Sequence, residues 1–168
     1  EVPEDRRDEV LDALRIDEIP AADLVIPAEE IIWLHLDDDL ETNLRRIGEH
    51  GRVRYPVLRT GSSREEVSMG DVRGFLYVPA LFGGDGWPRE GSLDLPSLLA
   101  PPFHLPADMP VSRLIDRLQE ESQELTLLTD PDDGDRVVGL VTVSDAFEVI
   151  AGDLQDPLDR AVPGADGG

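Results

Sequence analysis

The chain has 168 residues, of which 40% are hydrophobic, a length that suits one compact domain or two very small ones. Its 37 acidic and 15 basic residues give a net charge of −22, which disfavours nucleic acids and anionic lipid surfaces as partners. No cysteine is present, which excludes disulfides, thiolate catalysis and cysteine-ligated metals. We expect a soluble chain without a signal peptide, compatible with an intracellular compartment.

All 15 basic residues are arginine, and lysine is absent. A specific cation-binding role and an adaptation of the whole proteome to high salt would both explain the acidity. The acidic residues are scattered along the chain, and this favours the second explanation. We therefore expect a protein from a salt-loving organism, whose self-repulsion is screened at high ionic strength.

Hydrophobic spacing and breaker residues predict the elements of the first half. Residues 4–14 are expected to form an amphipathic lead-in helix, and 24–27 a short extended segment that ends at Pro27. The pattern then predicts, in order, a strand over 30–36, a helix from Leu40 that stops at Gly51, strands over 54–58 and 72–78 with a polar loop at 61–70 between them, and a helix that starts near Pro79.

The same order returns after a Gly- and Pro-rich linker. The second half is expected to contain an extended segment at 103–105, a helix that carries Val111, Ile115 and Leu118, a strand at 125–129, a turn at 130–135 and a strand at 137–141. The apolar positions of this helix match Leu40, Leu44 and Ile47 at an offset of 71, and Gly139 matches Gly74 at an offset of 65. The longer loop at 61–70 absorbs the difference of 6.

These offsets indicate an internal duplication of a β-α-β-β-α unit. The predicted fold class is α/β (α+β), with two halves that pack sheet against sheet because neither can bury its sheet alone. The expected organisation is a lead-in helix and linker at 1–18, repeat 1 at 19–82, a linker at 83–102, repeat 2 at 103–160 and a flexible tail at 161–168.

The strand at 137–141 runs directly into a helix start, where Thr142, Ser144 and Asp145 provide capping oxygens. The first amides of a helix have no internal partner and the dipole is positive there, so an anion can bind. The Thr142 hydroxyl suits a phosphate or hydroxyl contact, and the Asp145 carboxylate suits a ribose diol. On capping preference alone, plain caps remain the commoner explanation for such residues.

The order of elements resembles a tandem pair of CBS repeats, and the motifs resemble those of the CorC/HlyC (CNNM-type) magnesium and cobalt efflux proteins. The resemblance covers about residues 15 to 159. Four pieces carry it: Ile19-Pro20 with Val25-Ile26-Pro27, Val53-Arg54-Tyr55-Pro56-Val57, Gly74-Phe75-Leu76-Tyr77-Val78, and Gly139-Leu140-Val141-Thr142-Val143-Ser144-Asp145 followed by Glu148, Gly152-Asp153 and Asp156.

This resemblance implies a cytoplasmic regulatory module that binds an adenine nucleotide (AMP, ADP or ATP) with Mg²⁺ on its phosphates, forms homodimers and accompanies a membrane transport domain. It implies that Thr142 contacts phosphate or ribose, that Asp145 contacts the ribose hydroxyls and that Arg54 contacts the phosphates. It also implies that the adenine lies between the backbone near Pro27 and apolar side chains such as Val141 and Leu105.

Several positions depart from the family pattern. Ile26 and Ala28 replace a threonine and an arginine, and Val53 replaces a serine. Pro79-Ala80 replaces the lysine and aspartate of the first repeat, so Ala80 cannot accept a ribose hydrogen bond and only the second site keeps both side chains. Losing one such partner costs about 1–3 kcal/mol, which predicts an affinity tens of times weaker than that of a complete site.

Other motifs favour structural roles. The three histidines are far apart in sequence, the aspartates at 130–135 do not fit a calcium loop, and no nucleophile, base and orienting residue can be assembled into an enzyme site. We therefore expect a non-enzymatic module without a metal site of its own. Two alternatives stay open: a ligand-free dimerisation module with decayed sites, and a divalent-cation sensor that uses surface carboxylates.

Overall fold

The computed structural model describes residues 21–83, 87–89, 91 and 93–148. The expected lead-in helix at 4–14 and the expected tail at 161–168 lie outside the described residues. No helix in the described part of the chain has the length and apolar character needed to cross a membrane.

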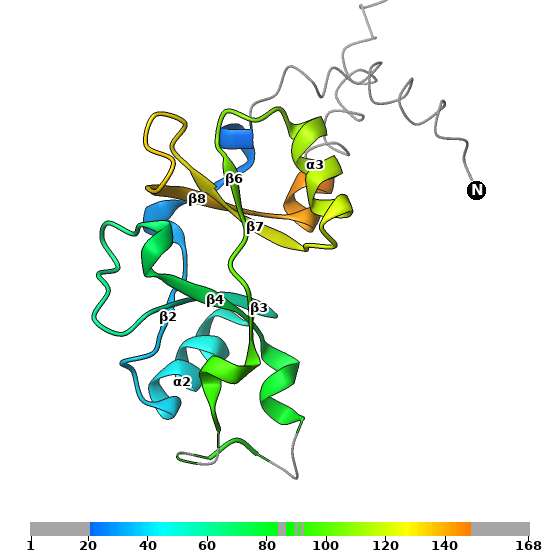
Figure 1. Cartoon of the computed structure of the whole chain (residues 1–168). Coiled ribbons are helices and arrows are strands. Elements are labelled where there is room, and N and C mark those ends of the chain that lie inside the picture. The colour runs from blue at the N-terminus through cyan, green and yellow to red at the C-terminus, as the bar shows by residue number, and fades with distance from the viewer. Residues whose placement is uncertain (1–20, 84–86, 90, 92, 149–168) are drawn as a thin grey trace, which may run out of the picture.

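The two halves contain the same elements in the same order (Figure 1). In each half a strand pairs parallel with the strand after the helix, and that second strand pairs antiparallel with the third. The predicted duplication is therefore confirmed. The first half comprises β2 (Leu34–His35), α2 (Leu40–His50), β3 (Arg54–Leu58) and β4 (Val72–Tyr77), and the second comprises β6 (His104–Pro106), α3 (Val111–Glu120), β7 (Leu125–Thr129) and β8 (Val137–Thr142).

Each sheet gains its fourth strand from a segment outside its own half. β1 (Ile26–Pro27) pairs antiparallel with β8, and β5 (Leu99–Ala100) pairs antiparallel with β4. The sheet orders are β1-β8-β7-β6 and β2-β3-β4-β5. In Figure 1 the blue N-terminal segment accordingly lies beside β8 before the chain enters the other half, so the two halves are linked by exchanged strands.

The two sheets pack face to face through a shared apolar core. Residues from both halves contribute to this central cluster, which comprises Ile31, Trp33, Leu58, Val67, Val72, Phe75, Leu125, Leu127, Val137 and Leu140. A second cluster lies between α3 and the sheet of β6 to β8, and a third brings Leu44 and Ile47 of α2 against the sheet of β2 to β4. The layers are thus helix, sheet, sheet and helix, and the predicted packing of sheet against sheet is confirmed.

Local sequence signals explain α2. Asp39 precedes its first residue with an extended backbone, and its carboxylate accepts a hydrogen bond of 2.7 Å from the backbone N–H of Thr42. Gly51 ends the helix in the left-handed conformation, at φ 61°, and its N–H donates to the carbonyl oxygen of Ile47. Both predicted boundaries are confirmed.

The strand predicted over 30–36 is wrong in extent, because only Leu34–His35 joins a sheet. A 3-10 turn, Ala28–Glu30, replaces its start. Ile31 and Trp33 are 7% and 4% exposed and pack in the central core without strand pairing. Burial between the sheets, and not a ladder of backbone hydrogen bonds, therefore accounts for these apolar residues.

The helix predicted near Pro79 is a short 3-10 helix, Val78–Phe82, with proline in its first turn. The helix after β8 begins at Val143, so Thr142 precedes it and Ser144 and Asp145 lie within its first turn. Three further 3-10 turns complete the described elements: Ala21–Leu24, Met69–Asp71 and Leu95–Leu98.

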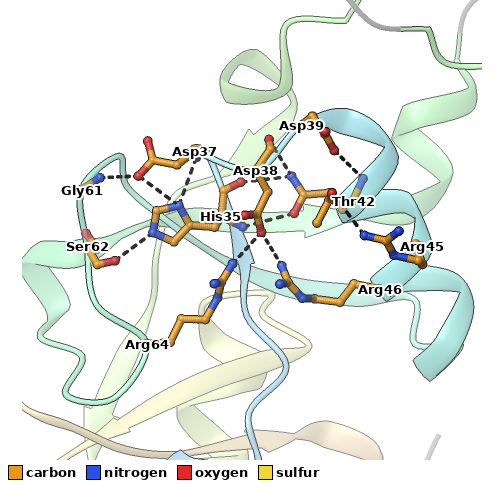
Figure 2. A network of polar contacts seen from close by, with 11 residues as sticks. His35, Asp37, Asp38, Asp39, Thr42, Arg45, Arg46, Gly61, Ser62 and Arg64 are labelled. Carbon is orange, nitrogen blue, oxygen red and sulfur yellow. Dashed lines mark hydrogen bonds and ion pairs between the residues drawn. The ribbon is translucent and has the colours of Figure 1, made fainter.

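The loop after β3 is tied to the start of α2 by a polar network (Figure 2). The buried imidazole of His35 lies with Nε2 2.9 Å from the carbonyl oxygen of Ser62, and its Nδ1 accepts a hydrogen bond from the backbone N–H of Asp37. The carboxylate of Asp37 accepts one from the N–H of Gly61 at 2.7 Å. Buried Asn43 binds both backbone groups of His35 through its side-chain amide.

Asp38 is the ionic centre of this network. Its Oδ2 pairs with Arg46 of α2 and, at 2.5 Å, with Nη2 of Arg64 in the loop. Burial, the largest single influence, would raise the pKa of Asp38, but the hydrogen bonds and charges of the two arginines together hold that pKa below its ordinary value. The loop then reaches the second half, where Val67 accepts a backbone hydrogen bond of 2.8 Å from Val137.

Candidate functional site

A cavity of about 770 Å³ opens between the two halves. Its walls come from β1 and the segment after it, from the start of β3, from the end of α3 and the turn that follows, and from the junction between β8 and the next helix. The lining residues are Ile26, Ile31, Ile32, Gly51, Arg52, Val53, Arg54, Tyr55, Pro56, Leu118, Gln119, Ser122, Gln123, Glu124, Leu125, Leu140, Thr142, Val143 and Ser144. We call this cavity the inter-repeat cleft.

The inter-repeat cleft combines an apolar wall with charged side chains. Ile26, Ile31, Ile32 and Leu140 provide the aliphatic surface that a planar ring needs. Among the described residues, its charged side chains are Arg52 and Arg54 against Glu124, two positive charges and one negative. In a chain with a net charge of −22, a cleft with an excess of arginine is a local exception. The arrangement suits an anion with an apolar, ring-shaped part.

Arg54 begins β3 and lies between two partners. Its Nη2 is 2.8 Å from Oε2 of Glu124, and its guanidinium stands 4.8 Å from the centroid of the Tyr77 ring. Arg54 is therefore already paired with a carboxylate in the fold. The Arg54 side chain remains 33% exposed, so it is accessible from the cleft.

Thr142 and Asp145 form a reciprocal cap at the start of the helix that begins at Val143. The Thr142 hydroxyl donates to Oδ2 of Asp145 at 2.7 Å and accepts from the N–H of Asp145 at 3.1 Å. The N–H of Thr142 is 3.4 Å from the same carboxylate oxygen. A carboxylate has about four acceptor sites, so the cap leaves Asp145 able to accept further hydrogen bonds.

The structure brings some of the predicted site residues together and separates others. Arg54 and Thr142 both line the inter-repeat cleft, and Asp145 reaches it only through its bonds to Thr142. Pro27 pairs with Gly139 in the sheet and is not part of the lining. Val141 and Leu105 are 0% and 5% exposed, respectively, and belong to the apolar core against α3, so they contribute to packing there.

Sequence reasoning missed the apolar wall and Glu124. The pattern predicts Ile31 and Ile32 as strand residues, and no motif marks Glu124 as a site residue. One signal was available, because the predicted offset of 71 places Glu124 at the position of Val53, next to Arg54 in the duplicated half. The structure shows this equivalence: the carbonyl oxygen of Glu124 accepts from the N–H of Val143 at 2.9 Å, and that of Val53 from the N–H of Val78 at 2.8 Å.

A smaller cavity of about 240 Å³ lies at the matching position of the first half. Tyr77 stands where Thr142 stands in the larger one, and Arg54 covers its ring. The two cavities share Arg54, the turn over residues 122–124 and Leu125. The Arg54–Glu124 ion pair therefore lies at the border between them.

Both the sequence and the fold of the chain resemble those of known proteins. Residues 95–152 match the CBS domain family model. This match marks the second half of the chain as a CBS domain. Its architecture matches a CBS domain of the bacterial CNNM/CorC family Mg²⁺ transporter in complex with ATP, at a TM-score of 0.71 and 24% identity over 88% of this chain and 98% of that one. It also matches a CBS-domain pair with bound AMP from Klebsiella pneumoniae, at a TM-score of 0.63 and 23% identity over 80% and 99% of the two chains.

Curated relatives include larger proteins. The chain is 27% identical over 159 residues to the magnesium and cobalt efflux protein CorC of Pasteurella multocida, covering 95% of this chain and 50% of the relative. It is 27% identical over 144 residues to the UPF0053 protein YrkA of Bacillus subtilis, covering 86% and 32%. The chain thus spans between about a third and a half of the length of these relatives.

Proposed function

We propose that the chain is a regulatory CBS module that binds an adenine nucleotide in the inter-repeat cleft. The observation that carries the proposal is the cleft itself, which places Arg52, Arg54 and Thr142 around an aliphatic wall in an otherwise acidic protein. The arginines would meet the phosphates, Thr142 and Asp145 the ribose, and the isoleucines the base. The neighbours with bound ATP and AMP support this assignment.

The transport context extends the same proposal. Relatives named magnesium and cobalt efflux proteins are about twice as long as the matched region. The module would serve as the cytoplasmic, non-enzymatic part of a membrane protein that moves Mg²⁺ or Co²⁺, would form a homodimer, and would bind its nucleotide with Mg²⁺ on the phosphates. A nucleotide can regulate such a protein only by binding two conformations of the module with different affinities.

One observation favours a second candidate, a ligand-free dimerisation module. Arg54 is already paired with Glu124, and Thr142 and Asp145 bind each other. Three of the four proposed polar ligand residues therefore already have a protein partner without a nucleotide. The cation-sensor alternative gains no comparable observation, because the described residues contain no group of three or more His, Asp or Glu side chains that could hold a metal ion.

A thermal unfolding titration tests the proposal. The melting temperature is measured with AMP, ADP and ATP, each with and without Mg²⁺, in molar KCl to screen the acidic surface. A ligand that binds only the folded state adds RT ln(1 + [L]/Kd), about 2.7 kcal/mol at one hundred times Kd. A saturable upward shift supports nucleotide binding. No shift at millimolar nucleotide, in a folded dimer, favours the dimerisation module.

A further inference from the structure

Glu124 occupies the turn between α3 and β7. Its backbone is fixed, because its carbonyl oxygen accepts a hydrogen bond of 2.9 Å from Val143 and the turn is set by Ser122, which has a positive φ of 52°. Its side chain is 62% exposed and makes its ion pair at the end of a flexible stem. The carboxylate is therefore free to swing away from Arg54 without disturbing the fold.

Arg54 is the more constrained member of the pair. It lies opposite Tyr77 in the β3/β4 register, and its guanidinium covers the Tyr77 ring at 4.8 Å. Stacking of a guanidinium on an aromatic ring holds its plane in place. Arg54 thus has a second contact that would hold it in place if the ion pair opened, and the exposed Glu124 side chain has no such second contact among the described residues.

The ion pair also lies where a ligand must approach. Arg54 and Glu124 both line the inter-repeat cleft, and both line the smaller cavity beside it. An anion that binds Arg54 from either cavity meets a guanidinium that already has a carboxylate partner. It has to replace an existing partner and, at the same time, stay close to a like charge.

We propose that Glu124 is a specificity-determining residue of the cleft: it acts as an internal anion that a phosphorylated ligand must displace from Arg54. This inference rests on the proposed nucleotide site. A ligand with several phosphate charges competes well for the guanidinium, a monophosphate less well, and a nucleoside without phosphate does not compete at all. Glu124 thereby weakens the binding of phosphorylated ligands, a cost that a polyphosphate recovers more easily than a monophosphate does, and it leaves a nucleoside without phosphate unaffected.

Neutralising Glu124 tests the mechanism. In Glu124→Gln the backbone hydrogen bond to Val143 is kept, so folding is preserved. We expect affinity for ATP and for inorganic tripolyphosphate to rise about two- to fivefold, the range of an exposed ion pair, while affinity for adenosine stays unchanged. Calorimetric titrations at one fixed KCl concentration provide the affinities.

Glu121→Gln is the matched control. It removes the same charge from the same end of α3, from a side chain that pairs with Arg117 at 3.1 Å and does not line the cleft. We expect affinities equal to those of the wild type. In Arg54→Gln the unpaired Glu124 should weaken ATP binding, and adding Glu124→Gln in the same chain should recover part of the loss, which measures the coupling directly.

The outcomes separate the two claims. Suppose that the wild type binds ATP but that Glu124→Gln binds ATP no more tightly than Glu121→Gln does, or that Glu124→Gln raises the affinity for adenosine as much as that for ATP. The displacement mechanism is then wrong, and the nucleotide site stands. If neither the wild type nor Glu124→Gln binds any nucleotide, both claims fall. Binding by Glu124→Gln alone would support the mechanism in its strongest form.

Discussion

Gly139 of β8 lies so close to Val25 that a β-carbon at position 139 would stand 1.8 Å from Cγ1 of Val25 and 2.9 Å from the carbonyl oxygen of Ile26. Only glycine allows the N-terminal strand to join the sheet of the second half at this point. The equivalent Gly74 faces the backbone of Ala100 in the same way. The repeated glycine thus marks the two places where the halves exchange strands.

Gly139→Ala should lower the free energy of unfolding by about 1–3 kcal/mol, because β1 must shift to admit the new methyl group. Urea unfolding at fixed KCl measures the change. Gly134→Ala is the control, since a β-carbon there meets nothing within 4 Å. Equal stability of the two variants would show that β1 does not pack as described, whereas partial recovery on adding Val25→Ala would locate the clash.

Asp38→Asn should weaken the link between α2 and the loop after β3. The Asp38 pKa is lowered in the fold, so its contribution is complete above the unfolded-state value near 4 and is lost as the pH falls through the folded-state pKa. We expect a loss of about 1 kcal/mol at pH 7. The difference from the wild type should shrink below about pH 4 in urea titrations across pH, and a pH-independent difference would contradict this account.

The charge of −22 predicts a strong dependence of stability on salt. Screening of scattered carboxylates should raise the melting temperature steadily between about 0.1 and 2 M KCl, because the Debye length falls below the spacing of surface charges. Scanning calorimetry measures the trend, with sucrose as an uncharged control for general solute effects. A flat or falling melting temperature in KCl would argue against adaptation to high salt.

Thr142→Val should abolish the hydroxyl contact that we assign to the ligand and weaken nucleotide binding by about fivefold, the equivalent of about 1 kcal/mol. Thr142→Ser keeps the hydroxyl and should bind as the wild type does. Because Thr142 also caps a helix, Asp39→Ala is the matched control: it removes the cap of α2 at a residue that does not line the cleft. Calorimetric titration with ATP reads out all three variants. Equal weakening in Asp39→Ala would mean that lost capping, and not a lost contact, explains Thr142→Val.

Sequence patterns predicted the helices and strands whose boundaries depend on nearby residues. The helix from Leu40 to its stop at Gly51 and the strands at 54–58 and 125–129 follow from caps, breakers and periodicity, and they match α2, β3 and β7. The duplication followed from the constant offset between equivalent residues. These features depend on neighbours close in sequence.

Features that depend on distant partners escaped prediction. No nearby sequence signal predicts that Ile26-Pro27 pairs with β8 in the other half, or that Leu99-Ala100 pairs with β4. Ile31 and Ile32 looked like strand residues and turn out to line a cleft. The role of Glu124 is visible only in the fold, where its Oε2 lies 2.8 Å from Nη2 of Arg54, a residue 70 positions away in the sequence.

Photolabelling with 8-azido-ATP, followed by peptide mapping, tests most directly the central claim that an adenine nucleotide binds between the repeats. We predict saturable labelling, blocked by excess ATP, in peptides that contain residues 26–32 or the junction at 140–144, because these segments contribute Ile26, Ile31, Ile32 and Leu140 to the apolar wall of the cleft. Labelling confined to other peptides, or labelling that excess ATP does not reduce, would contradict the account.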